Sequence, residues 1–164
     1  MNISSIKYFC TQNGPGFRTA VFVSGCTLHC HGCFNQVAWD FNAGTPMSDK
    51  IMNDILSSVE ADEIVGLSIL GGEPLDPHNQ EGVLEIVRAF RDKFGDSKTI
   101  WLWTGYTEER IPITEHTEEL LSEIDMAVVG PYIEELSSRD VLFAGSSNQK
   151  LVEFKKIMKA PVNF

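Results

Sequence analysis

The order of the expected elements constrains the fold more than any other feature, because β-rich segments alternate with amphipathic helical segments along the chain. The expected strands are residues 19–24, 64–70, 99–103 and 126–129. The expected helices are residues 48–59, 80–94 and 117–123. Strands that alternate with helices predict a parallel sheet with right-handed crossovers. A complete β/α barrel needs about 250 residues, so we expect an α/β fold with an open, partial parallel barrel.

The chain has 164 residues, of which 43% are hydrophobic, and this suffices for a core of ordinary size. No linker, internal repeat or low-complexity tract divides it, so we expect a single domain over residues 1–164. The pattern weakens after residue 132, and the segment from Gly145 onward is left without an assignment. No apolar run reaches the ~20 residues of a membrane helix. No secretion signal begins the sequence, so we expect a cytoplasmic location.

The formal net charge of −10 argues against one class of function. Nucleic-acid binding needs clustered Lys and Arg to contact phosphates, and here 13 basic residues are outnumbered by 23 acidic ones. We attribute the acidity to solubility, and we expect neither a nucleic acid nor a membrane as a partner.

Glycine-containing loops follow the expected strands at their carboxyl ends. Cys26 lies in the first of these loops, Gly72 in the second, Gly105 in the third and Gly130 in the fourth. In parallel α/β folds the carboxyl ends of the strands share one edge, and ligands bind there. We therefore expect these four residues to converge, although they are far apart in the sequence.

The first loop carries Cys26, Cys30 and Cys33, which are separated by three residues and then by two. Thiolates this close together on a loop can surround one metal centre, and a tight cysteine cluster favours metal over disulfides in a cytosolic chain. Three thiolates leave one iron of a [4Fe–4S] cubane without a protein ligand, because such clusters usually take four. That iron would be open to a substrate or a cofactor.

Two other metal sites would use the same cysteines. A zinc ion would need one more ligand, for which His29 or His31 is available. An electron-transfer cluster would need Cys10 as its fourth ligand, and Cys10 lies upstream of the first expected strand. A lone cysteine in that position is more typical of a small core residue.

A second motif accompanies the cysteines, because residues 71–74 read Gly-Gly-Glu-Pro directly after the second expected strand. The Cys-x3-Cys-x2-Cys motif followed by Gly-Gly-Glu-Pro resembles the radical S-adenosylmethionine family. Three further segments narrow the resemblance: residues 13–18 (Asn-Gly-Pro-Gly-Phe-Arg), residues 101–106 (Trp-Leu-Trp-Thr-Gly-Tyr) and residues 145–149 (Gly-Ser-Ser-Asn-Gln). Together they resemble the glycyl-radical enzyme activases that serve anaerobic ribonucleoside-triphosphate reductases.

The resemblance implies two cofactors, a [4Fe–4S] cluster on the three cysteines and S-adenosylmethionine. The residues implied to contact S-adenosylmethionine are Gly32, Phe34, Gly71, Gly72 and Glu73. The glycine pair and Glu73 would lie at the methionine end, where a missing side chain lets a ligand approach the backbone. Gly32 and Phe34 would border the adenine. No catalytic side chain is implied beyond the cluster and its cofactor.

Some of these residues also have structural interpretations. Phe34 would suit a core position that shields the cluster, and Glu73 would either hold its own loop or accept a hydrogen bond from the cofactor's ammonium group. Trp101 and Trp103 share one face of an expected strand, and we expect them to pack against the helices.

The implied activity is that of an oxidoreductase. It cleaves S-adenosylmethionine reductively and then removes a hydrogen atom from a backbone glycine of the reductase. The implied partners are the large subunit of that reductase and an electron donor such as a flavodoxin. One alternative is an enzyme that acts on another glycyl-radical enzyme or on a small molecule. The other alternative is a zinc or iron–sulfur module without catalysis.

Overall fold

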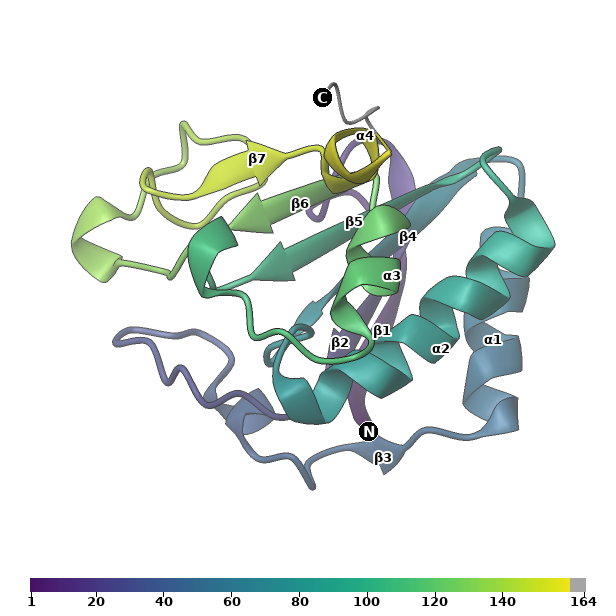
Figure 1. Cartoon of the computed structure of the whole chain (residues 1–164), viewed down its shortest axis with the longest axis horizontal. Coiled ribbons are helices and arrows are strands. Elements are labelled where there is room, and N and C mark those ends of the chain that lie inside the picture. The colour runs from purple at the N-terminus through teal and green to yellow at the C-terminus, as the bar shows by residue number, and fades with distance from the viewer. Residues whose placement is uncertain (160–164) are drawn as a thin grey trace.

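A seven-stranded sheet with helices on one face organises the computed structural model, which describes residues 1–159 (Figure 1). The strands are β1 (Asn2–Cys10), β2 (Phe17–Val23), β3 (Thr45–Pro46), β4 (Ile64–Gly71), β5 (Thr99–Thr104), β6 (Met126–Val129) and β7 (Lys150–Val152). The α-helices are α1 (Asp49–Val59), α2 (Pro77–Phe94), α3 (Thr117–Ser122) and α4 (Phe154–Met158). Short 3₁₀ helices are η1 (Gln36–Trp39), η2 (Glu108–Arg110) and η3 (Glu134–Leu136).

The strands lie in the order β3-β1-β2-β4-β5-β6-β7. The four strands expected from the sequence form the parallel centre, in which β2 pairs with β4, β4 with β5, and β5 with β6. The remaining strands add to this centre in antiparallel pairs. The α/β class and the largely parallel sheet are therefore confirmed, and the sheet is open, with β3 and β7 at its edges.

Three strands and one helix were not expected from the sequence. β1 carries no clear alternation of buried and exposed residues, because its pairing with β2 shifts register twice and Phe9 has a φ of 51°. β3 and β7 are only two and three residues long, and α4 only five. Elements this short hold too few residues to show a period.

Local capping explains where the two longest helices begin. The Ser48 hydroxyl accepts a hydrogen bond from the backbone N–H of Ile51 at the start of α1. The Asp76 carboxylate accepts one from the backbone N–H of His78, and Pro77 occupies the first position of α2. α2 therefore begins at residue 77, before the expected start at residue 80.

The two faces of the sheet have different surroundings. Leu67 and Ile69 of β4, with Ile100 and Leu102 of β5, belong to the buried core that includes residues of α1, α2 and α3. Successive side chains of a strand point to opposite faces, so Trp101 and Trp103 lie on the other face. The expectation that these tryptophans pack against the helices is therefore wrong.

On that second face the two indole rings contact each other, with 5.8 Å between their centroids. Trp103 joins a small cluster of buried residues with Cys10, Phe22 and Leu70.

Within residues 1–159, no helix is both long enough and apolar enough to cross a membrane.

Candidate functional site

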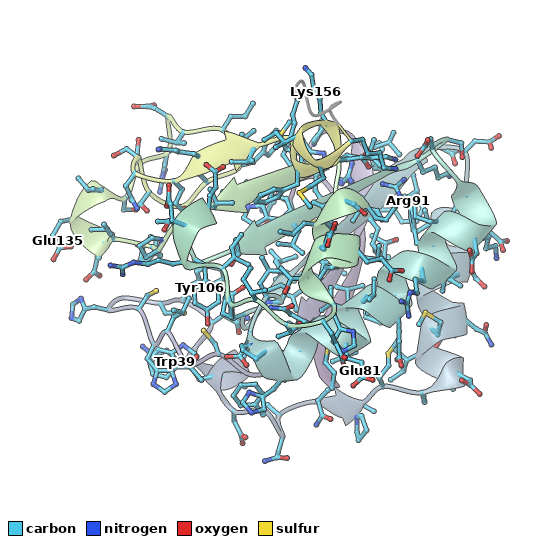
Figure 2. All side chains as sticks on the ribbon, viewed as in Figure 1. Trp39, Glu81, Arg91, Tyr106, Glu135 and Lys156 are labelled. Atoms are coloured by element: carbon cyan, nitrogen blue, oxygen red, sulfur yellow. The ribbon has the colours of Figure 1, made fainter. Side chains whose placement is uncertain are left out.

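A cavity of about 660 Å³ lies where the parallel strands end. Cys26, Gly72, Gly105 and Gly130 all line it, so the expected convergence of the four loops is confirmed. The arrowheads of β5 and β6 in Figure 1 point toward the side of the molecule that carries these loops. Figure 2 labels Trp39, Tyr106 and Glu135, from the segments that follow β2, β5 and β6 respectively.

The segment after β2, residues 24–35, is called here the cysteine loop. Its base is fixed, because the backbone N–H groups of Gly25 and Cys26 donate to the carbonyls of Ala38 and Trp39 at 2.8 and 3.1 Å. Beyond this point the loop is more open, and Cys30 and Cys33 are partly exposed. Cys26 is buried, and burial raises the pKa of its thiol. All three cysteines line the cavity.

Cys10 has a different environment from the other three cysteines. It is buried in the apolar cluster of the second sheet face, and its thiol donates to Asn13 Oδ1 at 3.2 Å. This is the environment of a small core residue, as the sequence suggested for Cys10.

The two histidines of the cysteine loop have partners of their own. The His29 ring stacks on Trp39, with 4.3 Å between centroids, and His31 Nδ1 lies 3.0 Å from a carboxylate oxygen of Glu134. Within residues 1–159, no three His, Cys, Asp or Glu side chains lie close enough to hold a single metal ion. A cubane binds its thiolates through different irons, so it does not require the ligands to meet around one ion.

The segment after β4, residues 71–75, is called here the glycine loop, and it touches the base of the cysteine loop. The backbone N–H of Gly72 donates to Val23 O, and that of Glu73 donates to Gly25 O, both at 2.8 Å. Gly71 has a φ of +122°, which favours glycine. A Cβ on Gly72 would lie 2.4 Å from the carbonyl oxygen of Gly25. Glycine is therefore needed here for contact between the two loops.

Glu73 holds the glycine loop to the end of β5. Its side chain is buried, with 1% of its surface exposed, and one of its oxygens accepts from Leu75 N at 2.9 Å and from Thr104 Oγ1 at 2.7 Å. The other oxygen accepts from Gly105 N at 2.7 Å. Burial nevertheless raises the pKa of Glu73 to about 7, against the effect of these hydrogen bonds. The residue also lines the cavity.

Phe34 and Gly32 occupy different places in the cysteine loop. The Phe34 side chain lines the cavity but is 89% exposed, so its interpretation as a core aromatic is wrong. Phe34 lies on the outer part of the cysteine loop, where the part of the chain that the structure describes leaves its ring open to solvent. Gly32 lies beside the carboxylate of Glu134, where a Cβ would be 2.7 Å from the Glu134 side chain.

Residues 131–149, which connect β6 to β7, supply a wall of the cavity that the sequence did not predict. Gln149 secures this segment, because its side chain accepts from Gly145 N at 2.8 Å and donates to Gly130 O at 2.9 Å. Tyr132, Phe143 and Arg139 line the cavity from this segment, and Arg139 is the one Lys or Arg among the lining residues of chain positions 1–159. The Gly-Ser-Ser-Asn-Gln motif was the available signal for this wall.

Comparison with known proteins agrees with this chemistry. The family model described as a 4Fe-4S single cluster domain matches residues 12–152. The anaerobic ribonucleoside-triphosphate reductase-activating protein of Pasteurella multocida is 34% identical over 153 residues, which cover 91% of this chain and 96% of that protein. The protein of the same name from Haemophilus influenzae is 36% identical over 154 residues, covering 92% and 97%.

A third relative of that name, from Escherichia coli K12, is 36% identical over 141 residues, which cover 84% of this chain and 88% of the relative. Similarity at this level extends over nearly the full length of both chains. The chain therefore belongs to the family of anaerobic ribonucleoside-triphosphate reductase-activating proteins.

Proposed function

We propose that this protein is a radical S-adenosylmethionine activase that generates the glycyl radical of an anaerobic ribonucleoside-triphosphate reductase. The observation that carries the proposal is the arrangement of Cys26, Cys30 and Cys33, which line one cavity together with the glycine loop. Cys10, the remaining cysteine, is buried in the apolar cluster of the second sheet face and is not among the described residues that line the cavity. Three thiolates suit a cubane that leaves one iron for a cofactor.

The residues that would hold the two groups follow from their places in the cavity. Cys26, Cys30 and Cys33 would bind the [4Fe–4S] cluster, and the glycine loop would bind the methionine end of S-adenosylmethionine. When bound, the two groups supply one-electron cleavage of a carbon–sulfur bond, which yields a carbon radical able to remove a hydrogen atom. The protein's contribution is to bind, to orient and to exclude water.

The ammonium and carboxylate groups of the methionine part would each have an oppositely charged partner. The Oε2 atom of Glu73 accepts only from Gly105 N among the bonds described above, so it retains capacity to accept from the ammonium group. Arg139 would face the carboxylate group, because a guanidinium is suited to bind a carboxylate. Phe34 would offer its ring to the adenine. Gly32 is not among the described residues that line the cavity, and it would border the adenine only from the outer edge of the same loop.

The substrate is proposed to be another protein, because the cavity extends from the carboxyl ends of the strands onto the sheet face opposite α1, α2 and α3, where Phe22, Leu70 and Trp103 line it. Within a single domain of the partial-barrel type, this side would admit the glycine-bearing loop of the large subunit of the reductase. Glycine suits the reaction, because its α-radical is stabilised by the flanking amides and carries no side chain. An electron donor such as a flavodoxin would reduce the cluster.

The test is to mix this protein anaerobically with the reductase, S-adenosylmethionine and a reductant, and to record the paramagnetic resonance spectrum. We expect a stable radical on the reductase, with the doublet splitting produced by one remaining α-hydrogen. A reductase variant with alanine in place of the reacting glycine is the control and should give no such doublet. Rapid consumption of S-adenosylmethionine without the reductase, and no protein radical with it, would instead indicate a small-molecule substrate. Purified protein that contains zinc in place of iron and sulfide would indicate a binding module.

A further inference from the structure

The first turn of α2 holds the two loops that line the cavity. Asn79 is the central residue, with 1% of its surface exposed. Its side-chain NH₂ group donates to Ser24 O at 3.0 Å and to Gly25 O at 3.2 Å, and both carbonyls belong to the base of the cysteine loop. The same group donates to Glu73 O at 3.0 Å, in the glycine loop. One amide side chain therefore joins both loops.

Asp76 provides a second link from the same turn. Its carboxylate, in a residue that is also 1% exposed, accepts from Thr27 Oγ1 at 3.0 Å. The other carboxylate oxygen accepts from His78 N and caps the helix. Asn79 and Asp76 thus contact the residues on either side of Cys26.

These side-chain contacts add to the backbone contact between the two loops. The two loops follow different strands. Glu73 N donates a backbone hydrogen bond directly from one loop to the other, at Gly25 O. Gly72 N donates a second one to Val23 O, at the end of β2. Side chains that are buried and hydrogen-bonded fix the distance between two loops more rigidly than exposed ones do. Outer residues that orient the ligands of a metal site typically change metal affinity or activity by about 10- to 100-fold when they are replaced.

We propose that Asn79 and Asp76 are positioning residues that hold the cluster-binding loop in register with the loop that binds the methionine end of the cofactor. This inference rests on the proposed function, because it concerns the same two groups. It goes beyond that function because it assigns the relative position of the two loops to α2, a helix that would contact neither the cluster nor the cofactor directly.

Gln80 is the matched control, because it is the next residue of the same turn and is equally buried. Its side chain donates to Leu75 O and Pro112 O at 2.9 and 2.8 Å and accepts from the Thr114 and Thr117 hydroxyls. It therefore ties α2 to the last residue of the glycine loop and to the segment after β5, and its hydrogen-bond partners in the described structure do not include the cysteine loop. Asn79→Leu and Gln80→Met each remove one buried amide of similar size.

The first measurement uses the metal-free protein, so that it does not depend on activity. In Asn79→Leu, amide hydrogen exchange should be faster at Gly25, Cys26 and Glu73, whose N–H groups make the bonds between and beneath the loops. In Gln80→Met, the increase should lie at Leu75 and in residues 112–117, and Gly25 and Cys26 should exchange as in wild type. The second measurement titrates S-adenosylmethionine against the reduced cluster by paramagnetic resonance. We expect an affinity at least about tenfold weaker in Asn79→Leu and near the wild-type value in Gln80→Met.

A third variant, Thr27→Val, keeps the test decisive if Asn79→Leu does not fold. Thr27 is exposed on the loop, so the change removes only the hydroxyl that Asp76 accepts from. We expect a smaller loss of cofactor affinity in the same direction. Equal behaviour of the Asn79 and Gln80 variants in both measurements, or a Thr27 variant identical to wild type, would overturn the inference. A wild-type cluster that does not respond to S-adenosylmethionine would instead contradict the proposed function itself.

Discussion

The cysteine loop and the glycine loop line the same cavity, but they are built differently. Residues 27–34 form the tip of the cysteine loop. In the described structure this tip has one internal backbone hydrogen bond, which Cys33 N donates to Cys30 O. Cys30 and Cys33 are partly exposed there. In the glycine loop, Glu73 is 1% exposed and accepts three hydrogen bonds through its carboxylate.

The difference indicates which part of the site the fold builds by itself. The glycine loop, in which residues 73–75 are buried and Glu73 makes three hydrogen bonds, is already organised in the protein chain alone. The tip of the cysteine loop has few bonds of its own, so we expect the cluster to supply much of its order. Metal binding and local folding are coupled in this way when a site is not preformed. Four changes test the contrast.

Removal of a proposed cluster ligand should have the largest effect on function and little effect on the metal-free fold. Cys30→Ala leaves two thiolates, so we expect loss of iron, sulfide and all activity. The free energy of unfolding of the metal-free protein should change by less than about 0.5 kcal/mol, because the residue lies on an open loop. Iron analysis and urea unfolding check the two statements. Cys10→Ala is the control and should keep the cluster; the reverse outcome would show that the ligands are wrongly assigned.

Gly72→Val should damage both loops at once. The added side chain would meet Gly25 O at 2.4 Å and Ala38 O at 2.8 Å, and these are backbone atoms that support the cysteine loop. We expect a loss of stability of about 2 kcal/mol and poor retention of the cluster, measured by urea unfolding and by iron content. A variant with a full cluster that fails to bind S-adenosylmethionine would show that Gly72 serves the approach of the ligand and not the contact between loops.

Glu73 should give the metal-free protein a dependence on pH. Burial raises the pKa of Glu73 from an ordinary 4.5 to about 7, so the folded state binds this proton more tightly than the unfolded state does. The resulting stabilisation is fully present below about pH 4.5 and is lost as the pH rises to about 7. Its size is at most roughly 3 kcal/mol.

Urea unfolding of wild type and Glu73→Gln across this pH range measures that contribution. The difference between the two stabilities should fall as the pH rises, because glutamine cannot bind the proton. A difference that is independent of pH would contradict the raised pKa.

Phe34→Ala should have the smallest effect. The side chain is 89% exposed, so stability should change by less than about 0.5 kcal/mol. If the ring borders the adenine, cofactor affinity should fall a few-fold in a titration of the reduced cluster. Val37→Ala, at a side chain that is 76% exposed on the neighbouring η1 helix, is the matched control and should leave the affinity unchanged. Equal affinities of the two variants would remove Phe34 from the binding site.

The amino-acid sequence determined the parallel centre of the sheet and the meeting of its loops. β2, β4, β5 and β6 are apolar runs that turn into glycine-containing loops, and this pattern lies within a few neighbouring residues. Parallel pairing then brings Cys26, Gly72, Gly105 and Gly130 to one edge by geometry alone. The same reasoning could not place β1, whose exposed residues and register shifts hide its period.

Tertiary structure decided which side chains support the site. The bonds from Asn79 to Ser24 and Glu73 join residues of three different segments, and nothing local in the sequence marks such a contact. Alternation along β5 predicts which of its residues share a face with Trp103, but it does not predict which face the helices cover. Packing of the helices against the opposite face decided this. Sequence periodicity reports burial along one element, whereas register between loops depends on hydrogen bonds that form only when distant segments meet.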